Sequence, residues 1–252
     1  MGFGPLASAV SSSPLTQDEL KLALRHSPVL RLDRREPFFP SRAAVTVFSE
    51  PGESPSFPRS ITIPKGADFV VEFALWWDWD IQHLYELEHV WIAVEKEGRV
   101  VAVEASWHGI LHRFPHWRMA DTHPVLFCQP GKHAFAPDPY HFPRWGTWYA
   151  CTVGAGAMGL LVKDMFTEAF TPSEELDRVV RRYLRRFAFV PTFRFTKEVR
   201  LPPEAFTTWE GLRRYIPERV KAVLTELLER KAVRKEDRGE VSVRRRRHRS
   251  FG

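Results

Sequence analysis

The middle of the chain is organised by a two-residue alternation of hydrophobic and polar positions, which is typical of β-strands. Residues 67–77 form a nearly continuous apolar run rich in Phe, Val and Trp, which predicts a buried strand. Residues 89–107 contain two β-branched runs around a Lys-Glu-Gly turn, so they predict a hairpin. Shorter strands are predicted at 28–33, 44–48, 123–129 and 189–202.

Helical patterns flank this region. Thr16, with Glu19 three residues later, forms a capping-box sequence for a short helix that ends at Pro28. Ser173 precedes an amphipathic helix, and its apolar face is formed by Leu176, Val179, Val180 and Leu184. Residues 209–233 predict a last helix, in which a proline marks either the start or a kink.

Together these elements predict an α+β fold, an antiparallel β-sandwich core with C-terminal helices. Residues 1–15 are small and polar and predict a disordered leader, because no positive charge precedes a proper apolar stretch as in a signal peptide. Residues 16–233 predict a single globular domain, with the sandwich extending to about residue 170 and helices after it. Residues 234–252 predict a basic, disordered tail.

Composition narrows the partners and the compartment. The 252 residues carry a formal net charge of +6, but five arginines lie within the last nine residues, so the rest is nearly balanced and a nucleic-acid partner is not indicated. No apolar run is long enough to span a membrane. Cys128 and Cys151 lack the spacing of a metal or redox pair and are expected as buried free thiols in a reducing cytoplasm. The oligomeric state is left open.

Acidic and histidine side chains gather between the long strand and the hairpin. Glu86 and Glu88 alternate with Val90 and Ile92, so on a strand all four share one face, which is apolar further along. Two carboxylates that point into the core need a cation, because an unpaired buried carboxylate is very costly, and the neighbouring sequence offers no lysine or arginine. A divalent metal is therefore the expected partner. The candidate ligands are Asp78, Asp80, His83, Glu86 and Glu88.

Ligand chemistry favours particular metals. Carboxylates with one imidazole suit Mg²⁺, Mn²⁺ or Ca²⁺, and iron or zinc also accept such ligands. Solvated acidic side chains at strand ends are the alternative explanation of the same pattern. The Glu/His spacing of helical di-iron bundles is disfavoured, because β-branched residues follow Glu88 and the motif has no second copy.

Two further histidines stand where predicted strands end. His108 lies in Ser-Trp-His-Gly after the hairpin, and His133 lies in Pro-Gly-Lys-His-Ala-Phe after the strand 123–129. Functional groups concentrate at such transitions, so both are candidate catalytic residues, as a general base or as a partner of a metal ligand. A hydrogen bond from each ring to loop backbone is the structural alternative.

Four motifs in matching order resemble the NPP1-type necrosis-inducing proteins and the related Vps62-like proteins. His-x-x-Glu-x-Glu-His-Val-x-Ile at 83–92 resembles their central motif, a glycine-led His-Arg-His-Asp-Trp-Glu that supplies metal ligands. Residues 26–41 resemble an N-terminal strand pair, Ser-Trp-His-Gly at 106–109 a downstream Ser-x-His-Gly, and residues 123–134 a motif ending Gly-Ser-His-Ala. The resemblance covers roughly residues 26–140.

By position, the resemblance implies that His83, Glu86 and Glu88 stand for the first histidine, the aspartate and the glutamate of that motif. Asp78 or Asp80 would then match an upstream aspartate, and the later histidine would be at 133. The chain departs from the motif at four positions, namely Gln82, Tyr85, Glu86 and Leu87. The plant-membrane-directed activity of secreted members is therefore not carried over.

The sequence thus predicts a divalent-metal-dependent protein. The first hypothesis is a hydrolase that acts on an ester, phosphoester or polar head-group substrate, with surrounding tryptophans excluding water or stacking on a ring. The alternative is a protein that binds a glycan or lipid head group through the metal without turnover. A metal that only closes one end of the sandwich is a third, structural hypothesis.

Overall fold

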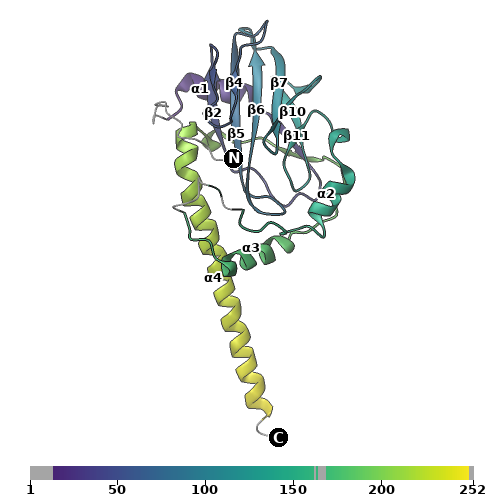
Figure 1. Cartoon of the computed structure of the whole chain (residues 1–252), viewed down its shortest axis with the longest axis vertical. Helices are drawn as coiled ribbons and strands as arrows, with labels where there is room; N and C mark the ends of the chain where they lie inside the picture. The colour runs from purple at the N-terminus through teal and green to yellow at the C-terminus, as the bar shows by residue number, and fades with distance from the viewer. Residues whose placement is uncertain (1–13, 162, 164–168, 250–252) are drawn as a thin grey trace.

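The computed structural model describes residues 14–161, 163 and 169–249, with side chains as far as residue 230. It is a mixed α+β structure that has two mixed, mostly antiparallel sheets and a C-terminal helix (Figure 1). Of the predicted leader, residues 1–13 lie outside the described residues.

The larger sheet has six described strands in the order β13-β2-β5-β6-β7-β8, and all neighbours are antiparallel except β13 and β2. Its centre is the pair of 11-residue strands β5 and β6, whose Val, Phe and Trp side chains suit a buried pleated surface. The bounds are β2 (Arg42–Phe48), β5 (Phe69–Trp79), β6 (Leu84–Val94), β7 (Val100–Trp107), β8 (Ile110–Arg113) and β13 (Phe206–Thr207).

The smaller sheet has the order β11-β10-β1-β12, and β9 also pairs with β10. A separate two-stranded ribbon is formed by β3 and β4. The bounds are β1 (Val29–Leu32), β3 (Gly52–Glu53), β4 (Ser60–Ile61), β9 (Arg118–Ala120), β10 (His123–Cys128), β11 (Phe135–Ala136) and β12 (Lys197–Val199).

Both of these sheets are mostly antiparallel, as predicted, but each also contains one parallel pair, which the sequence did not indicate. β1 runs parallel to β10, and β13 runs parallel to β2. In both pairs the partners are far apart in the sequence, and a long connection lets two strands run in the same direction. Local sequence patterns carry no signal for such distant pairings.

One hydrophobic cluster joins the two sheets. Val90 and Ile92 of β6 belong to the same cluster as Leu126 of β10. Because side chains alternate along a strand, Glu86 and Glu88 point to the same buried side as Val90 and Ile92. The predicted shared face of the two glutamates is confirmed.

Two helices have the predicted caps. α1 (Gln17–His26) begins with the capping box: the hydroxyl of Thr16 accepts from the Glu19 backbone N–H at 3.2 Å, and the Glu19 carboxylate accepts from the Thr16 N–H at 2.8 Å. α3 (Glu174–Arg185) starts at Ser173, whose hydroxyl accepts from the Leu176 N–H. Such caps satisfy backbone donors that the first helical turn leaves open.

Two connecting segments differ from their predictions. Residues 129–148 are predicted as loop, but they include β11, a short 3-10 helix at Pro139–His141 and the start of α2 (Arg144–Cys151). The predicted strand 189–202 shortens to β12, because Thr192 turns to the smaller sheet and donates its N–H and hydroxyl to Asp33 at 2.8 and 2.9 Å.

α4 (Trp209–Arg249) runs along β2 and β5 and continues well beyond the sheets (Figure 1). Its first turns pack Leu212 and Ile216 on the core, and Pro217 lies inside the helix. Residues 234–249 are also helical, whereas their charged composition predicts disorder. Lys, Arg and Glu are good helix formers, so the same composition suits either state.

The remaining sequence expectations concern cysteines and membranes. Cys128 and Cys151 are both buried and free, as expected. Among the described helices, none is long and apolar enough to cross a membrane.

Candidate metal centre

The candidate site lies at the turn between β5 and β6, against the loop that follows β10. Ile81 donates its N–H to Gly131 O at 2.8 Å, and Leu84 donates to Gly159 O at 2.8 Å, so the turn is held from two sides. Gly131 has a φ of 69°, and a Cβ there would lie 2.8 Å from Ile81 Cγ2. Only glycine allows this approach, which brings the loop at 129–133 over the strand ends.

Among the described residues, two triads of acidic and histidine side chains could hold a metal ion. The inner triad is Asp80, His83 and Glu86, and the outer triad is Glu86, Glu88 and His108. Within each triad, one ligand atom per residue lies within 4.8 Å of the others, and Glu86 belongs to both. Four of the five predicted metal ligands therefore come together, with His108 as an additional member.

Asp80 is a fully buried member of the inner triad. Its Oδ1 accepts from the Gln82 backbone N–H at 2.6 Å, and its Oδ2 lies 2.8 Å from Nζ of Lys132. Burial alone would raise the pKa of Asp80, but the nearby His83, Lys132 and His133 hold it below its ordinary value. His83, together with Lys132 and His133 of the opposite loop, thus keeps Asp80 as a carboxylate.

The ring of His83 is oriented by backbone. Its Nδ1 lies 3.1 Å from Leu84 O, and a carbonyl only accepts, so Nδ1 carries a proton, and in the neutral ring the lone pair is then on Nε2. Nε2 lies 3.5 Å from Lys132 Nζ and 3.6 Å from Asp80 Oδ1. A backbone acceptor on the other ring nitrogen is how proteins commonly orient a ligating histidine.

The outer triad places two carboxylates beside one imidazole. Glu88 accepts from the Ser106 hydroxyl and, at 2.9 Å, from the His108 backbone N–H. His108 Nδ1 lies 3.3 Å from Glu88 Oε1 and 3.6 Å from Glu86 Oε2. Burial and the nearby charge of Glu86 raise the pKa of Glu88 to about 7. A cation between the two carboxylates would relieve this repulsion.

Two consecutive hydrogen bonds, from Thr147 through Gln129 to His108, orient the His108 ring toward the carboxylates. Gln129 donates its amide N–H to Thr147 Oγ1 at 2.9 Å, so its carbonyl oxygen faces His108 Nε2 at 3.2 Å. His108 Nε2 therefore carries a proton, and Nδ1 faces Glu86 and Glu88. Burial would lower the pKa of His108, but its hydrogen bond to Glu86 and the charges of both glutamates raise it. His108 thus belongs to a group of residues that could hold a metal ion, whereas the sequence predicts it as a catalytic residue.

Asp78 does not join either triad. Arg219 of α4 donates from Nε to both carboxylate oxygens, at 3.2 and 3.0 Å, and from Nη2 to Oδ2 at 2.7 Å. Trp76 Nε1 also donates to Oδ1 at 3.1 Å. Alternation along β5 turns Asp78 to the side covered by α4. The structure thus places this predicted metal ligand against α4, apart from both triads.

His133, a predicted catalytic residue, belongs to neither triad. Its ring is fully buried, stacks on Trp77 with centroids 4.9 Å apart, and places Nε2 3.3 Å from Glu36 Oε1. Its neighbour Lys132 reaches the inner triad. The ring of His133 is therefore enclosed between Trp77 and Glu36.

Sequence reasoning missed the residues that support the site. Lys132 and Ser106 stand beside the histidines that the motifs single out, and Gln129 ends a predicted strand. Glu36 lies in a loop early in the chain and accepts from the Gly131 N–H at 2.7 Å. Their positions within the motifs were a usable signal, but their contacts depend on the fold.

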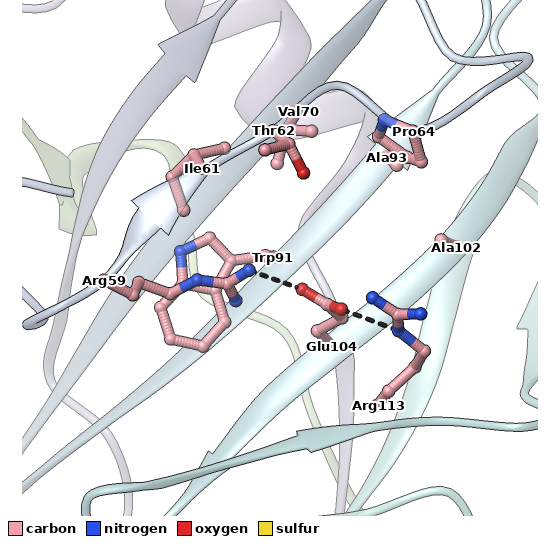
Figure 2. Close-up of a pocket in the computed structure, with 10 residues that line it drawn as sticks. All are labelled: Arg59, Ile61, Thr62, Pro64, Val70, Trp91, Ala93, Ala102, Glu104 and Arg113. Carbon is pink, nitrogen blue, oxygen red and sulfur yellow. Dashed lines mark hydrogen bonds and ion pairs between the residues drawn. The ribbon is translucent and has the colours of Figure 1, made fainter. Parts of the chain in front are cut away.

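A separate pocket of about 160 Å³ lies on the other face of the larger sheet, beneath the segment after β4 (Figure 2). Glu104 bridges Arg59 and Arg113 at 2.8 and 2.9 Å, and the Arg59 guanidinium covers the Trp91 ring at 4.5 Å. Burial would raise the pKa of Glu104, but the two arginines lower it. Because Glu104 is already matched by two cations, the candidate functional site is the cluster at the β5–β6 turn.

No protein-family model, curated protein or solved structure matches the chain. The resemblance to the NPP1-type and Vps62-like proteins stays a prediction from the sequence. The functional argument therefore depends on the geometry of the two triads.

Proposed function

We propose that this protein binds one divalent metal ion at the outer triad and hydrolyses an ester or phosphoester of a small molecule or polar head group. The observation that carries the proposal is the convergence of Glu86, Glu88 and His108, with Glu88 and His108 held by hydrogen bonds of their own. Ligands fixed in this way favour metal binding, because little ordering remains to be done.

The donor set suits hard divalent ions. Two carboxylates and one imidazole favour Mg²⁺, Mn²⁺ or Ca²⁺, and iron or zinc also accept them. The His108 side chain is 34% exposed, whereas that of Glu88 is 1% exposed. The triad is therefore buried at Glu88 and open to solvent at His108, and a catalytic metal position requires such an open side.

A divalent ion bound there would polarise a substrate oxygen and lower the pKa of a coordinated water. The chain supplies the other groups. In the neutral ring of His83, Nε2 can accept a proton next to the triad, and Lys132 can stabilise negative charge that develops on an oxygen. His83 thus takes the role of base that the sequence analysis gave to the histidines at 108 and 133.

The proposal extends to a β-sandwich of the NPP1-like and Vps62-like kind that works in the cytoplasm. Two sheets that share one hydrophobic cluster and four motifs in matching order support the fold. Two buried free thiols support a reducing compartment.

A second candidate function is metal-dependent binding of a glycan or lipid head group without turnover. It is favoured by α2, which provides Thr147 to the two hydrogen bonds that orient His108 and also carries Trp145. Trp145 is 76% exposed and stacks on Trp148 with centroids 5.1 Å apart. Exposed indole faces suit a sugar ring or an interfacial head group.

Chromogenic substrates test the hydrolase. We expect the wild type to turn over p-nitrophenyl phosphate, bis(p-nitrophenyl) phosphate or p-nitrophenyl acetate only with Mg²⁺, Mn²⁺, Ca²⁺, Fe²⁺ or Zn²⁺. Glu88→Gln should lose metal and turnover, whereas His83→Ala should keep the metal and lose roughly 10²–10⁴-fold in rate. Glu104→Gln, which alters a carboxylate in the separate pocket, is the control. Metal-dependent glycan binding with no turnover would favour the second candidate.

A further inference from the structure

The inner triad already holds a cation. Lys132 Nζ lies 2.8 Å from Asp80 Oδ2 and 3.5 Å from His83 Nε2, and its side chain is only 12% exposed. A carboxylate oxygen and an imidazole lone pair are also the first two ligands that a metal ion would take there. The ammonium therefore stands in the place of an ion.

The two triads are adjacent because both contain Glu86. Its Oε1 accepts from the Leu87 N–H at 3.1 Å, and its Oε2 lies 3.6 Å from His108 Nδ1 of the outer triad. A carboxylate shared by two neighbouring cations is a regular feature of two-metal sites, in which the ions lie about 3.5–4 Å apart. The chain thus contains the protein side of such a site, with one position filled by its own lysine.

We propose that Lys132 is a tethered cation that fills the inner of two adjacent cation positions, so that removing its charge opens that position to a second divalent ion. Asp80 is fully buried, and a buried carboxylate without a cation is strongly destabilising. Some cation must therefore occupy the inner triad. An ammonium held by the backbone of the 129–133 loop is always present there, and its charge opposes the entry of a free ion.

The occupant of the outer triad follows from the proposed function, but the inference about Lys132 does not require it. The relevant quantity is the difference in metal stoichiometry between the wild type and Lys132→Met. The absolute stoichiometry of the wild type tests the proposed function instead. The failure of one is therefore distinguishable from the failure of the other.

Mn²⁺ is the probe, because it can be counted by titration calorimetry and seen by electron paramagnetic resonance. We expect one Mn²⁺ per wild-type chain and two per Lys132→Met chain, with a spin-coupled spectrum only in the variant. Lys132→Arg keeps a cation and should bind one. The double variant Lys132→Met with His83→Ala should return to one, because the inner position then lacks its imidazole.

Stability provides a second readout if metal-free Lys132→Met folds poorly. Asp80 is then unpaired, so the melting temperature without metal should fall, and Mn²⁺ should raise it by more than in the wild type. No Mn²⁺ in the wild type and one in Lys132→Met would support the inference and contradict the outer-triad proposal. Equal stoichiometry in the two proteins, or two ions in the wild type, would overturn the inference.

Discussion

Replacing Asp78 by asparagine separates its structural role from the metal ligation that its sequence position suggests. The Asp78 carboxylate accepts hydrogen bonds from Nε and Nη2 of Arg219 and from the indole N–H of Trp76, and these bonds join β5 to α4. Burial of Asp78 at this contact requires a partner, and the partner is an arginine more than a hundred residues away in the sequence. Asp78→Asn should therefore destabilise the protein and leave metal binding unchanged.

The exposure of the pair sets the size of the effect. The side chains of Arg219 and Asp78 are 35% and 15% exposed, so the pair lies between an exposed ion pair and a buried one. Exposed pairs contribute roughly 0.2–1 kcal/mol, and hydrogen bonds to charged groups about 1.5–3 kcal/mol. We expect a loss of about 1–2 kcal/mol in the free energy of unfolding, or roughly 2–8 °C in melting temperature for a chain of this size.

Urea denaturation and calorimetric titration with Mn²⁺ measure the two quantities on the same samples. Arg219→Met should reproduce the loss of stability, and the double variant should lose little more than either single one. Glu198→Gln, in a half-exposed pair with Arg31, is the control and should change stability by less than about 1 kcal/mol. Loss of Mn²⁺ binding in Asp78→Asn at unchanged stability would refute this reasoning.

Two other substitutions test buried polar groups. Burial raises the pKa of Glu72 above its ordinary value of 4.5. The folded state therefore holds the proton of this carboxyl group more tightly than the unfolded state does. The contribution of Glu72 to stability consequently falls as pH rises above 4.5. Glu72→Gln should flatten that fall above pH 4.5, and urea midpoints that decline equally in both proteins would contradict it. His133→Ala removes a ring stacked on Trp77 and a partner of Glu36, so unfolding should become easier by about 2–4 kcal/mol while Mn²⁺ still binds. Unchanged stability with lost Mn²⁺ would contradict this prediction.

Local chemistry made part of the fold and site predictable. The Thr16–Glu19 capping box and the Ser173 cap depend on residues three apart, and both helices begin where those residues place them. Alternation along β6 placed Glu86 and Glu88 on one inward face. These features follow from spacing alone, because the residues concerned lie on the same element.

The partners of the acidic groups were not predictable in this way. The absence of nearby basic residues favoured a metal, yet Asp78 is paired with Arg219 and Asp80 with Lys132 across long sequence separations. The chain also changes direction after Trp79, where β5 ends. Asp78 is on the strand, whereas Asp80 is in the turn and accepts a hydrogen bond from the Gln82 N–H. A two-residue spacing therefore did not keep the two aspartates together.

The stoichiometry of Mn²⁺ binding to the wild type, Glu88→Gln and His108→Ala tests the central claim most directly. The account predicts about one ion per wild-type chain and at least roughly a 100-fold loss of affinity in each variant, since even residues that only orient a metal ligand are worth 10–100-fold. A wild type that binds no divalent ion, or variants that bind as tightly as the wild type, would contradict the assignment of the outer triad as a metal site.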